Sequence, residues 1–177
     1  AGRTLSPFLK GQTGDRREYL FTEYHTHSAH NFYPQRTVRD KRFKLIHNLM
    51  PHEVNPGYEF TRRKFFEKLH QVVSKAPHPV RSAYERMQRP PEYELYDLQT
   101  DPHEFRNLVD ASEFATTFAR LKAQLANWRK RTNDPLLDPD NLARLKAEID
   151  ACITDDGASK ADLKLTYPDY FATSNIK

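Results

Sequence analysis

The chain has 177 residues, of which 37% are hydrophobic and 29% are charged, and its formal net charge is only +4. This length suits one ordinary domain or a piece of a larger protein, and the low net charge argues against a wholly disordered chain. No run of about 18 apolar residues is present that could span a bilayer, so we expect no membrane span. The single cysteine, Cys152, excludes an internal disulfide framework and a cysteine-rich zinc site.

The first seventeen residues have the composition of a connecting segment. They contain three glycines and one proline among mostly polar residues. Because the chain also starts without Met, we expect it to be a fragment whose upstream part is missing.

Three segments have the patterns of β-strands. Aromatic and β-favouring residues from Glu18 to Tyr24 predict a first strand. Residues 36–39 and 43–49 predict an antiparallel hairpin, because only three charged residues separate them. The alternating sequence YELYDL at 93–98 predicts a further strand.

Helical periodicity begins near Glu59, where apolar residues up to Val73 recur at helical spacing with basic residues between them. The prolines at 77, 79, 90 and 91 predict an irregular stretch after that helix. The strongest helical pattern follows, with Asp110 and Ser112 available as caps. Its apolar stripe consists of Phe114, Phe118, Leu121, Leu125 and Trp128. A last helix is predicted from Asp138 to Ile149, because Pro139 suits the first helical position.

The densest group of chemically versatile residues follows the first strand and contains Glu23, His25, His27 and His30. Neutral imidazoles with a carboxylate could ligate zinc or another transition metal, whereas protonated imidazoles could bind sulfate or phosphate. These histidines could equally be loop residues on the surface without any ligand. The spacing does not decide between these three interpretations.

Other chemistry is sparse in this sequence. It has no G-x-S-x-G, no glycine-rich phosphate loop and no H-E-x-x-H. Cys152 follows a predicted helix end and lies among acidic residues, a setting that does not suit a reactive thiol, so we expect an unreactive cysteine. Basic residues could attract a polyanion, but they lack the interleaved aromatic residues of a nucleic-acid module, so we expect no nucleic-acid partner. The most clustered of them are Arg36, Arg39, Lys41, Arg42, Lys44, Arg62, Arg63 and Lys64.

Residues 94–108, with the sequence ELYDLQTDPHEFRNL, resemble the ELYDLxxDPxExxNL strand and turn in the C-terminal part of type I sulfatases, of the alkaline-phosphatase-like superfamily. Residues 36–40 with 42–46 resemble that family's hairpin, and residues 5–11 and 17–23 resemble the link that leaves its catalytic domain and the strand that follows it. His27, Tyr33-Pro34, Arg36 and residues 44–49 look most like the heparan N-sulfatase (sulfamidase) branch. The resemblance extends over roughly residues 5–131.

The resemblance implies an α+β fold, in which a small antiparallel sheet packs against the long helix of the Phe114 to Trp128 stripe, with additional helices. It implies three parts: a linker from a missing catalytic domain at 1–17, a sulfatase C-terminal subdomain at 18–132, and a C-terminal helix with an extended tail at 133–177. Sulfatases use a formylglycine made from a C/S-x-P-x-R motif beside a calcium ion. Cys152 is followed by Ile153 and Thr154, and the motif is absent. We therefore expect the nucleophile and calcium in the N-terminal catalytic domain, and no activity from this chain alone.

By the same resemblance, the whole enzyme would hydrolyse sulfate esters or sulfamates of a sulfated glycan such as heparan sulfate. It would act in the periplasm, outside the cell or in the lysosome. His27, and next to it His25 and His30, would contact the substrate, while no catalytic residue or metal ligand is expected in this chain. The alternative is a free-standing polyanion-binding or protein-interaction module without enzymatic activity.

Overall fold

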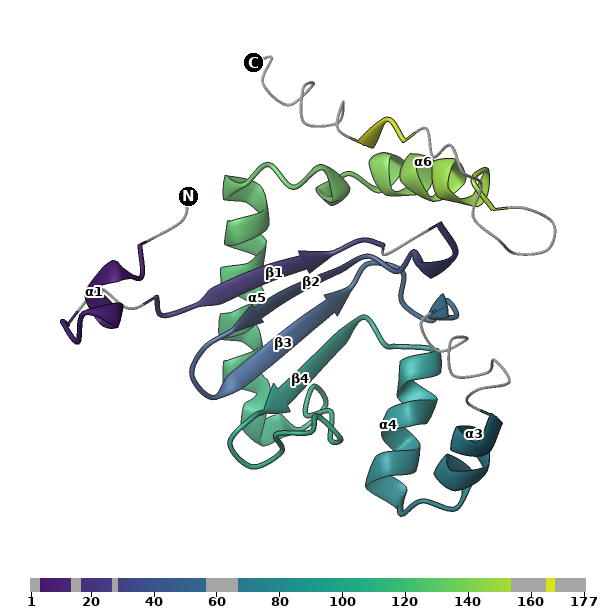
Figure 1. The fold of residues 1–177 in the computed structure, drawn as a ribbon, viewed down its shortest axis with the longest axis horizontal. Helices are drawn as coiled ribbons and strands as arrows, with labels where there is room; N and C mark the ends of the chain where they lie inside the picture. Colours follow the sequence, from purple (N-terminus) through teal and green to yellow (C-terminus); the bar gives the residue numbers. More distant parts are fainter. Residues whose placement is uncertain (1–3, 14–16, 27–28, 57–66, 154–164, 168–177) are drawn as a thin grey trace.

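A computed structural model describes residues 4–13, 17–26, 29–56, 67–153 and 165–167 (Figure 1). At its centre is one four-stranded antiparallel sheet in which every strand pairs with its neighbour in sequence, in the order β1-β2-β3-β4. The strands are β1 Leu20–Tyr24, β2 Gln35–Arg39, β3 Phe43–Asn48 and β4 Tyr93–Asp97. The predicted first strand, hairpin and YELYDL strand are therefore confirmed.

The register of the sheet assigns each side chain to one of two faces. Phe21 pairs with Val38, Val38 with Leu45, and Leu45 with Leu95. Since side chains alternate along a strand, this apolar row shares one face, and the residues between them share the other.

The long helix α5, Ala115–Arg131, crosses the face that carries the apolar row and lies behind the sheet in Figure 1. Leu121 and Leu125 are buried there against Val38, Leu45 and Leu95. This confirms the predicted helix and its packing against the sheet, and with it the α+β fold.

The predicted caps of this helix are wrong. Its N-cap is Phe114, which offers no side-chain oxygen, and neither Asp110 nor Ser112 caps it. Instead, a short 3₁₀ turn, η4 Ser112–Phe114, leads into the first turn of the helix.

The stretch between β3 and β4 contains two helices, α3 Glu67–Ser74 and α4 His78–Gln88. The first agrees with the helix predicted from Glu59, whose residues 59–66 lie outside the described part of the chain. The prediction of an irregular stretch at the prolines is wrong. Pro77 is the N-cap of α4 and Pro79 lies in its first turn, where a missing N–H costs nothing, and Pro90 follows its end.

A second apolar cluster lies beyond the C-terminal end of α5. The turn η5, Pro135–Leu137, leads into α6, Pro139–Asp150, whose first turn is capped by the Asp138 carboxylate accepting from the Asp140 N–H at 2.9 Å. This confirms the helix predicted from Asp138. The helix packs against η1, Ala29–Asn31, and buries the residues Ala29, Phe32, Leu136, Leu145, Ile149 and Cys152.

At the N-terminal side, α1, Ser6–Leu9, is a single helical turn set apart from the sheet (Figure 1). Within the described ranges, no helix combines the length and the apolar character needed to cross a membrane. The predicted boundaries at residues 17 and 132 stay predictions.

Candidate functional site

The α5 face of the sheet changes from apolar to polar along the strands. Two residues further along each strand, on the same face as the apolar row, lies a polar row. In it Glu23 pairs with Arg36, Arg36 with His47, and His47 with Tyr93. This polar row lies toward the end of α5 that carries Arg129, and the chain then turns back at Asp134. Residues that are far apart in sequence therefore meet at one end of the sheet.

Arg36 and Asp134 form a buried, two-point ion pair at the centre of this end. Arg36 donates from Nε to Asp134 Oδ2 at 2.8 Å and from Nη2 to Oδ1 at 2.7 Å. Arg129 donates from Nε to the same Oδ2 at 2.6 Å and from Nη2 to the Leu136 carbonyl at 2.7 Å. Burial by itself would raise the pKa of Asp134, but the hydrogen bonds and charges of the two guanidinium groups lower it below its usual value.

His47 extends the cluster toward solvent. Its Nδ1 lies 3.3 Å from Arg129 Nη1, and a guanidinium can only donate, so Nδ1 accepts and the ring proton resides on Nε2. The ring stacks on Tyr93 at a centroid distance of 4.4 Å. Burial, followed by the positive charge of Arg129, lowers the pKa of His47 to about 4. The imidazole is therefore neutral near pH 7.

Of the histidines predicted to contact substrate, only the side chain of His25 is described. Its Nε2 lies 3.2 Å from the Tyr167 hydroxyl, and its ring meets the Tyr167 ring edge-on at 4.8 Å. Burial and then the charge of Arg36 lower its pKa to about 4. His25 is therefore a neutral hydrogen-bonding group beside the ion cluster. His27 lies outside the described residues, and His30 falls in η1 without a described side chain.

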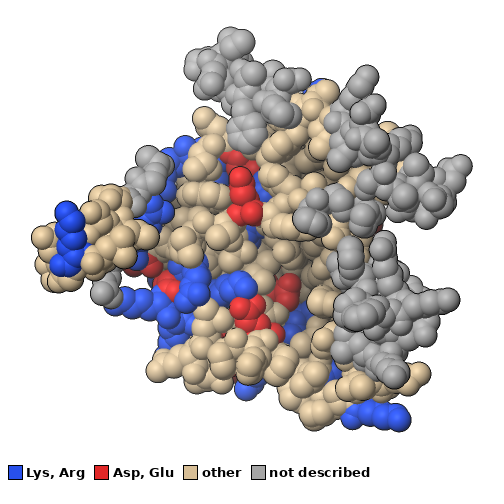
Figure 2. All heavy atoms as spheres, viewed as in Figure 1, with Lys and Arg blue, Asp and Glu red and all other residues tan. Residues whose placement is uncertain are grey.

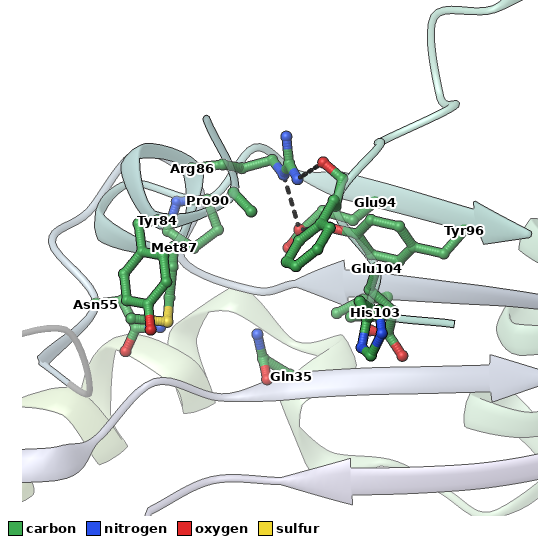
Figure 3. Close-up of a pocket in the computed structure, with 13 residues that line it drawn as sticks. Gln35, Asn55, Tyr84, Arg86, Met87, Pro90, Glu94, Tyr96, His103 and Glu104 are labelled. Carbon is green, nitrogen blue, oxygen red and sulfur yellow. Dashed lines mark hydrogen bonds and ion pairs between the residues drawn. The ribbon is translucent and has the colours of Figure 1, made fainter. Parts of the chain in front are cut away.

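The opposite face of the sheet, here called the open face, contains a cavity that the sequence did not reveal (Figure 3). It has a volume of about 450 Å³ and lies between α4, the strands β2 to β4 and the turn at 103–105. Its lining residues are Gln35, Ile46, Asn55, Ala83, Tyr84, Arg86, Met87, Pro90, Glu94, Tyr96, His103, Glu104 and Phe105.

Glu94 is the buried polar centre of this cavity. It accepts hydrogen bonds from the Tyr96 hydroxyl and, at 2.9 Å, from the Asn48 side-chain amide. Arg86 reaches over from α4, with its Nε 3.5 Å from Glu94 and its Nη2 donating to the Phe105 carbonyl at 2.8 Å (Figure 3). Burial, followed by the charge of Glu94, raises the pKa of the Tyr96 hydroxyl, which therefore stays protonated.

Two of the residues that line the cavity, Glu104 and Gln35, each belong to a polar pair. Lys44 donates to both oxygens of Glu104 at 2.9 and 2.8 Å, and Gln35 donates to the Asn48 side-chain oxygen at 2.6 Å. With apolar walls from Ile46 and Met87, these groups offer both donors and acceptors to a hydroxyl-bearing ligand. A sequence signal existed in the alternation of 93–98, which places Glu94 and Tyr96 on the face away from Leu95.

The described residues include no group of three or more His, Cys, Asp or Glu side chains arranged to hold a metal ion. They therefore do not fit a calcium site. Cys152 is buried just after α6 in the second apolar cluster, and it is followed by Ile153 rather than by the residues of a formylglycine precursor.

This arrangement, a four-stranded antiparallel sheet crossed by one long helix, also occurs in solved sulfatase structures. A 2-O GAG sulfatase superposes with a TM-score of 0.51 and 22% identity, covering 80% of this chain and 24% of the sulfatase. A Bacteroides thetaiotaomicron protein assigned as a sulfatase superposes with a TM-score of 0.50, also at 22% identity, over 80% of this chain and 24% of its own. The fold is therefore that of a part of a sulfatase.

Sequence comparisons point to the same class. The chain is 31% identical over 153 residues to N-sulphoglucosamine sulphohydrolase of Homo sapiens, covering 82% of this chain and 29% of that protein. It is 26% identical over 140 residues to an ulvan-active sulfatase of Formosa agariphila, covering 76% of this chain and 25% of that protein. No protein-family profile matches the chain. The chain thus spans less than a third of these relatives, and it is a C-terminal portion of a sulfatase.

Proposed function

We propose that the chain is the C-terminal subdomain of an enzyme that removes sulfate from a sulfated glycan, either from sulfate esters or from N-sulfate groups such as those of heparan sulfate. The observation that carries this proposal is the 31% identity to N-sulphoglucosamine sulphohydrolase over most of the chain. The fold found in two solved sulfatase structures supports it.

In this proposal the chain supplies a wall of the substrate cleft and not the reacting groups. A formylglycine and a calcium ion in the N-terminal catalytic domain would supply the nucleophile and its electrostatic support. The described residues of this chain would bind and orient the glycan. The three parts of the chain, with limits at residues 17 and 132, belong to this proposal, as does an extracytoplasmic or lysosomal location.

His27, His25 and His30 remain the proposed substrate contacts. The low pKa of His25 defines what that residue would do, since a neutral imidazole gains little from the charge of a sulfate group. It would instead exchange hydrogen bonds with a sugar hydroxyl, with the Tyr167 hydroxyl fixing its Nε2. Arg36 on β2 and Asp134 would hold the strand that follows this loop in place.

The proposal is tested with the full-length protein and a panel of sulfated substrates. Sulfate release is measured from N-sulphoglucosamine, from O-sulfated glucosamine and from an ulvan oligosaccharide. We expect release from at least one glucosamine derivative, and the ratio of the two rates decides between sulfamate and ester cleavage.

Two results would count against the proposal. Release from ulvan alone would assign another glycan. A folded protein that releases no sulfate but binds a heparin column would support the alternative of a polyanion-binding module.

A further inference from the structure

On the open face, the edge strand β1 carries side chains unlike those of a strand that faces solvent. Its three open-face positions are Leu20, Thr22 and Tyr24, and Leu20 and Tyr24 are 48% and 42% exposed. The Tyr24 hydroxyl donates to the Asn31 carbonyl at 3.3 Å, which holds the ring on this surface. In an antiparallel sheet with one face in water, such positions are usually polar. Here two of the three are large and apolar or aromatic.

The two edge strands of the sheet, β1 and β4, differ in how far the rest of the chain covers them. At β4 the edge is covered by the chain itself, because Leu108 N–H donates to the Leu95 carbonyl and the Asn107 side chain accepts from Leu95 N–H, at 2.8 and 2.9 Å. At β1, no backbone hydrogen bond outside its ladder with β2 occurs within the described ranges. The strand also contains neither Lys nor Pro, the residues that usually protect a free edge.

A cation borders this surface. Arg39 lies opposite Leu20 on β1 and opposite Lys44 on β3, on the open face. Lys44 is neutralised by Glu104. Arg39 is exposed, and the hydrogen bond that its side chain makes within the described part of the chain is a long one, 3.4 Å to the Asp40 carbonyl. A surface that packs here would therefore be apolar, with a carboxylate opposite Arg39.

We propose that this surface, made of Leu20, Thr22, Tyr24, the free edge of β1 and Arg39, is where the remainder of the same sulfatase packs. The inference rests on the proposed function, because it takes the missing part to be the sulfatase catalytic domain. The amount of missing chain supports it, since this chain spans only 29% of N-sulphoglucosamine sulphohydrolase.

Figure 2 looks onto this face of the molecule, where uncharged atoms extend between groups of Lys, Arg, Asp and Glu atoms. Covering it would bury the exposed parts of Leu20 and Tyr24 and pair the edge amides of β1, both of which stabilise the covered state.

The test is solvent access to Thr22 in the full-length protein. Thr22→Cys introduces a thiol of similar size at the centre of the surface, and Val72→Cys places one on α3, where Val72 is 65% exposed. The rate of maleimide modification is followed peptide by peptide, so that the buried Cys152 and other cysteines do not interfere. We expect Thr22→Cys to react at least tenfold more slowly than Val72→Cys.

Equal rates for the two thiols would overturn the inference and would show a solvated face. Protection that weakens on dilution, with a dimer seen by light scattering, would also overturn it, in favour of a second copy. Leu20→Lys provides an independent readout, with an expected loss of thermal stability that Val72→Lys does not share. The labelling rate does not depend on turnover, so the two proposals can fail separately. An active sulfatase in which Thr22→Cys is unprotected would refute only this inference. A protein in which the thiol is protected but sulfatase activity is absent would refute only the proposed function.

Discussion

The two faces of one small sheet are built in different ways. On the α5 face, every strand contributes an apolar residue to a sealed row, and the polar row beside it is closed by Asp134 and Arg129. On the open face, polar groups line a cavity on one half, and Leu20 and Tyr24 remain exposed on the other. The α5 face is therefore closed by residues of this chain alone, whereas the open face has the exposed apolar side chains expected of a surface that packs against another part of the protein.

The largest effect should come from breaking the buried ion cluster. Asp134→Ala would remove the carboxylate shared by the buried Arg36 and Arg129 and leave Arg36 only its longer, 3.8 Å pair with Glu23, so we expect a cost of about 3–5 kcal/mol in the free energy of unfolding. Urea denaturation of the chain measures this loss. The control is Lys146→Ala in the exposed pair with Asp150, which should cost less than about 1 kcal/mol. Similar losses in the two variants would mean that the cluster is not a buried one.

Truncation in the apolar row should be nearly as costly. Leu125 is 2% exposed between α5 and the sheet, so Leu125→Ala should cost about 2–5 kcal/mol at unchanged denaturant slope. The control Leu137→Ala removes a side chain that is 44% exposed and should change stability by about 0.5 kcal/mol or less. A small loss at Leu125 would indicate that α5 does not seal this face.

Acidification should weaken the polar end of the α5 face. His25 and His47 have pKa values of about 4 in the folded chain, against 6.5 for an unperturbed histidine, so the unfolded state binds their protons first. Their contribution is fully present above pH 6.5 and is lost as the pH falls through 4. Melting temperatures between pH 7.5 and 4 should show this fall, and His47→Gln should make it shallower. An unchanged slope in that variant would contradict the neutral, buried state of His47.

The histidine loop carries His27, the first of the proposed substrate contacts. In the full-length enzyme, His27→Ala should lower kcat/KM on a sulfated sugar at least tenfold, which corresponds to about 1.4 kcal/mol of transition-state stabilisation. His78→Ala, on the exposed surface of α4, serves as a matched control and should leave the kinetics unchanged. If His27→Ala retains the wild-type kinetics and fold, His27 is an ordinary loop residue.

The smallest effect is expected on the open face. The Lys44–Glu104 pair is partly exposed, at 25% and 30% of the two side chains, so Glu104→Gln should cost only about 0.2–1 kcal/mol. The effect should shrink in 1 M salt, where exposed ion pairs are screened. A salt-independent loss above about 2 kcal/mol would place this pair in the same category as the ion pair of Arg36 with Asp134.

Most of the helices and strands could be predicted from the sequence, because strand alternation and helical spacing depend only on residues that are close together in the chain. The alternation in YELYDL and the 3–4 spacing from Phe114 to Trp128 predicted β4 and α5, and the resemblance to sulfatases implied that the helix packs against the sheet. The helix α4 was missed because its prolines stand at the N-terminal end and beyond the C-terminal end, where they delimit a helix rather than break it.

The polar clusters could not be found in this way. Arg36 and Asp134 are 98 positions apart, and only the fold brings them together. In the same way, Arg86 on α4 meets Glu94 on β4 only through the packing of that helix beside the sheet. The sequence did single out His25, but not that burial and Arg36 would keep it neutral.

We propose that this chain is a structural and substrate-binding part of a sulfatase whose nucleophile lies elsewhere. The most direct test compares the purified chain with the full-length protein on a chromogenic aryl sulfate with calcium present. We expect turnover by the full-length protein, and no turnover by this chain alone above that of a heat-treated control. Turnover by the chain alone would contradict it, because no described residue and no sequence motif of this chain provides the nucleophile.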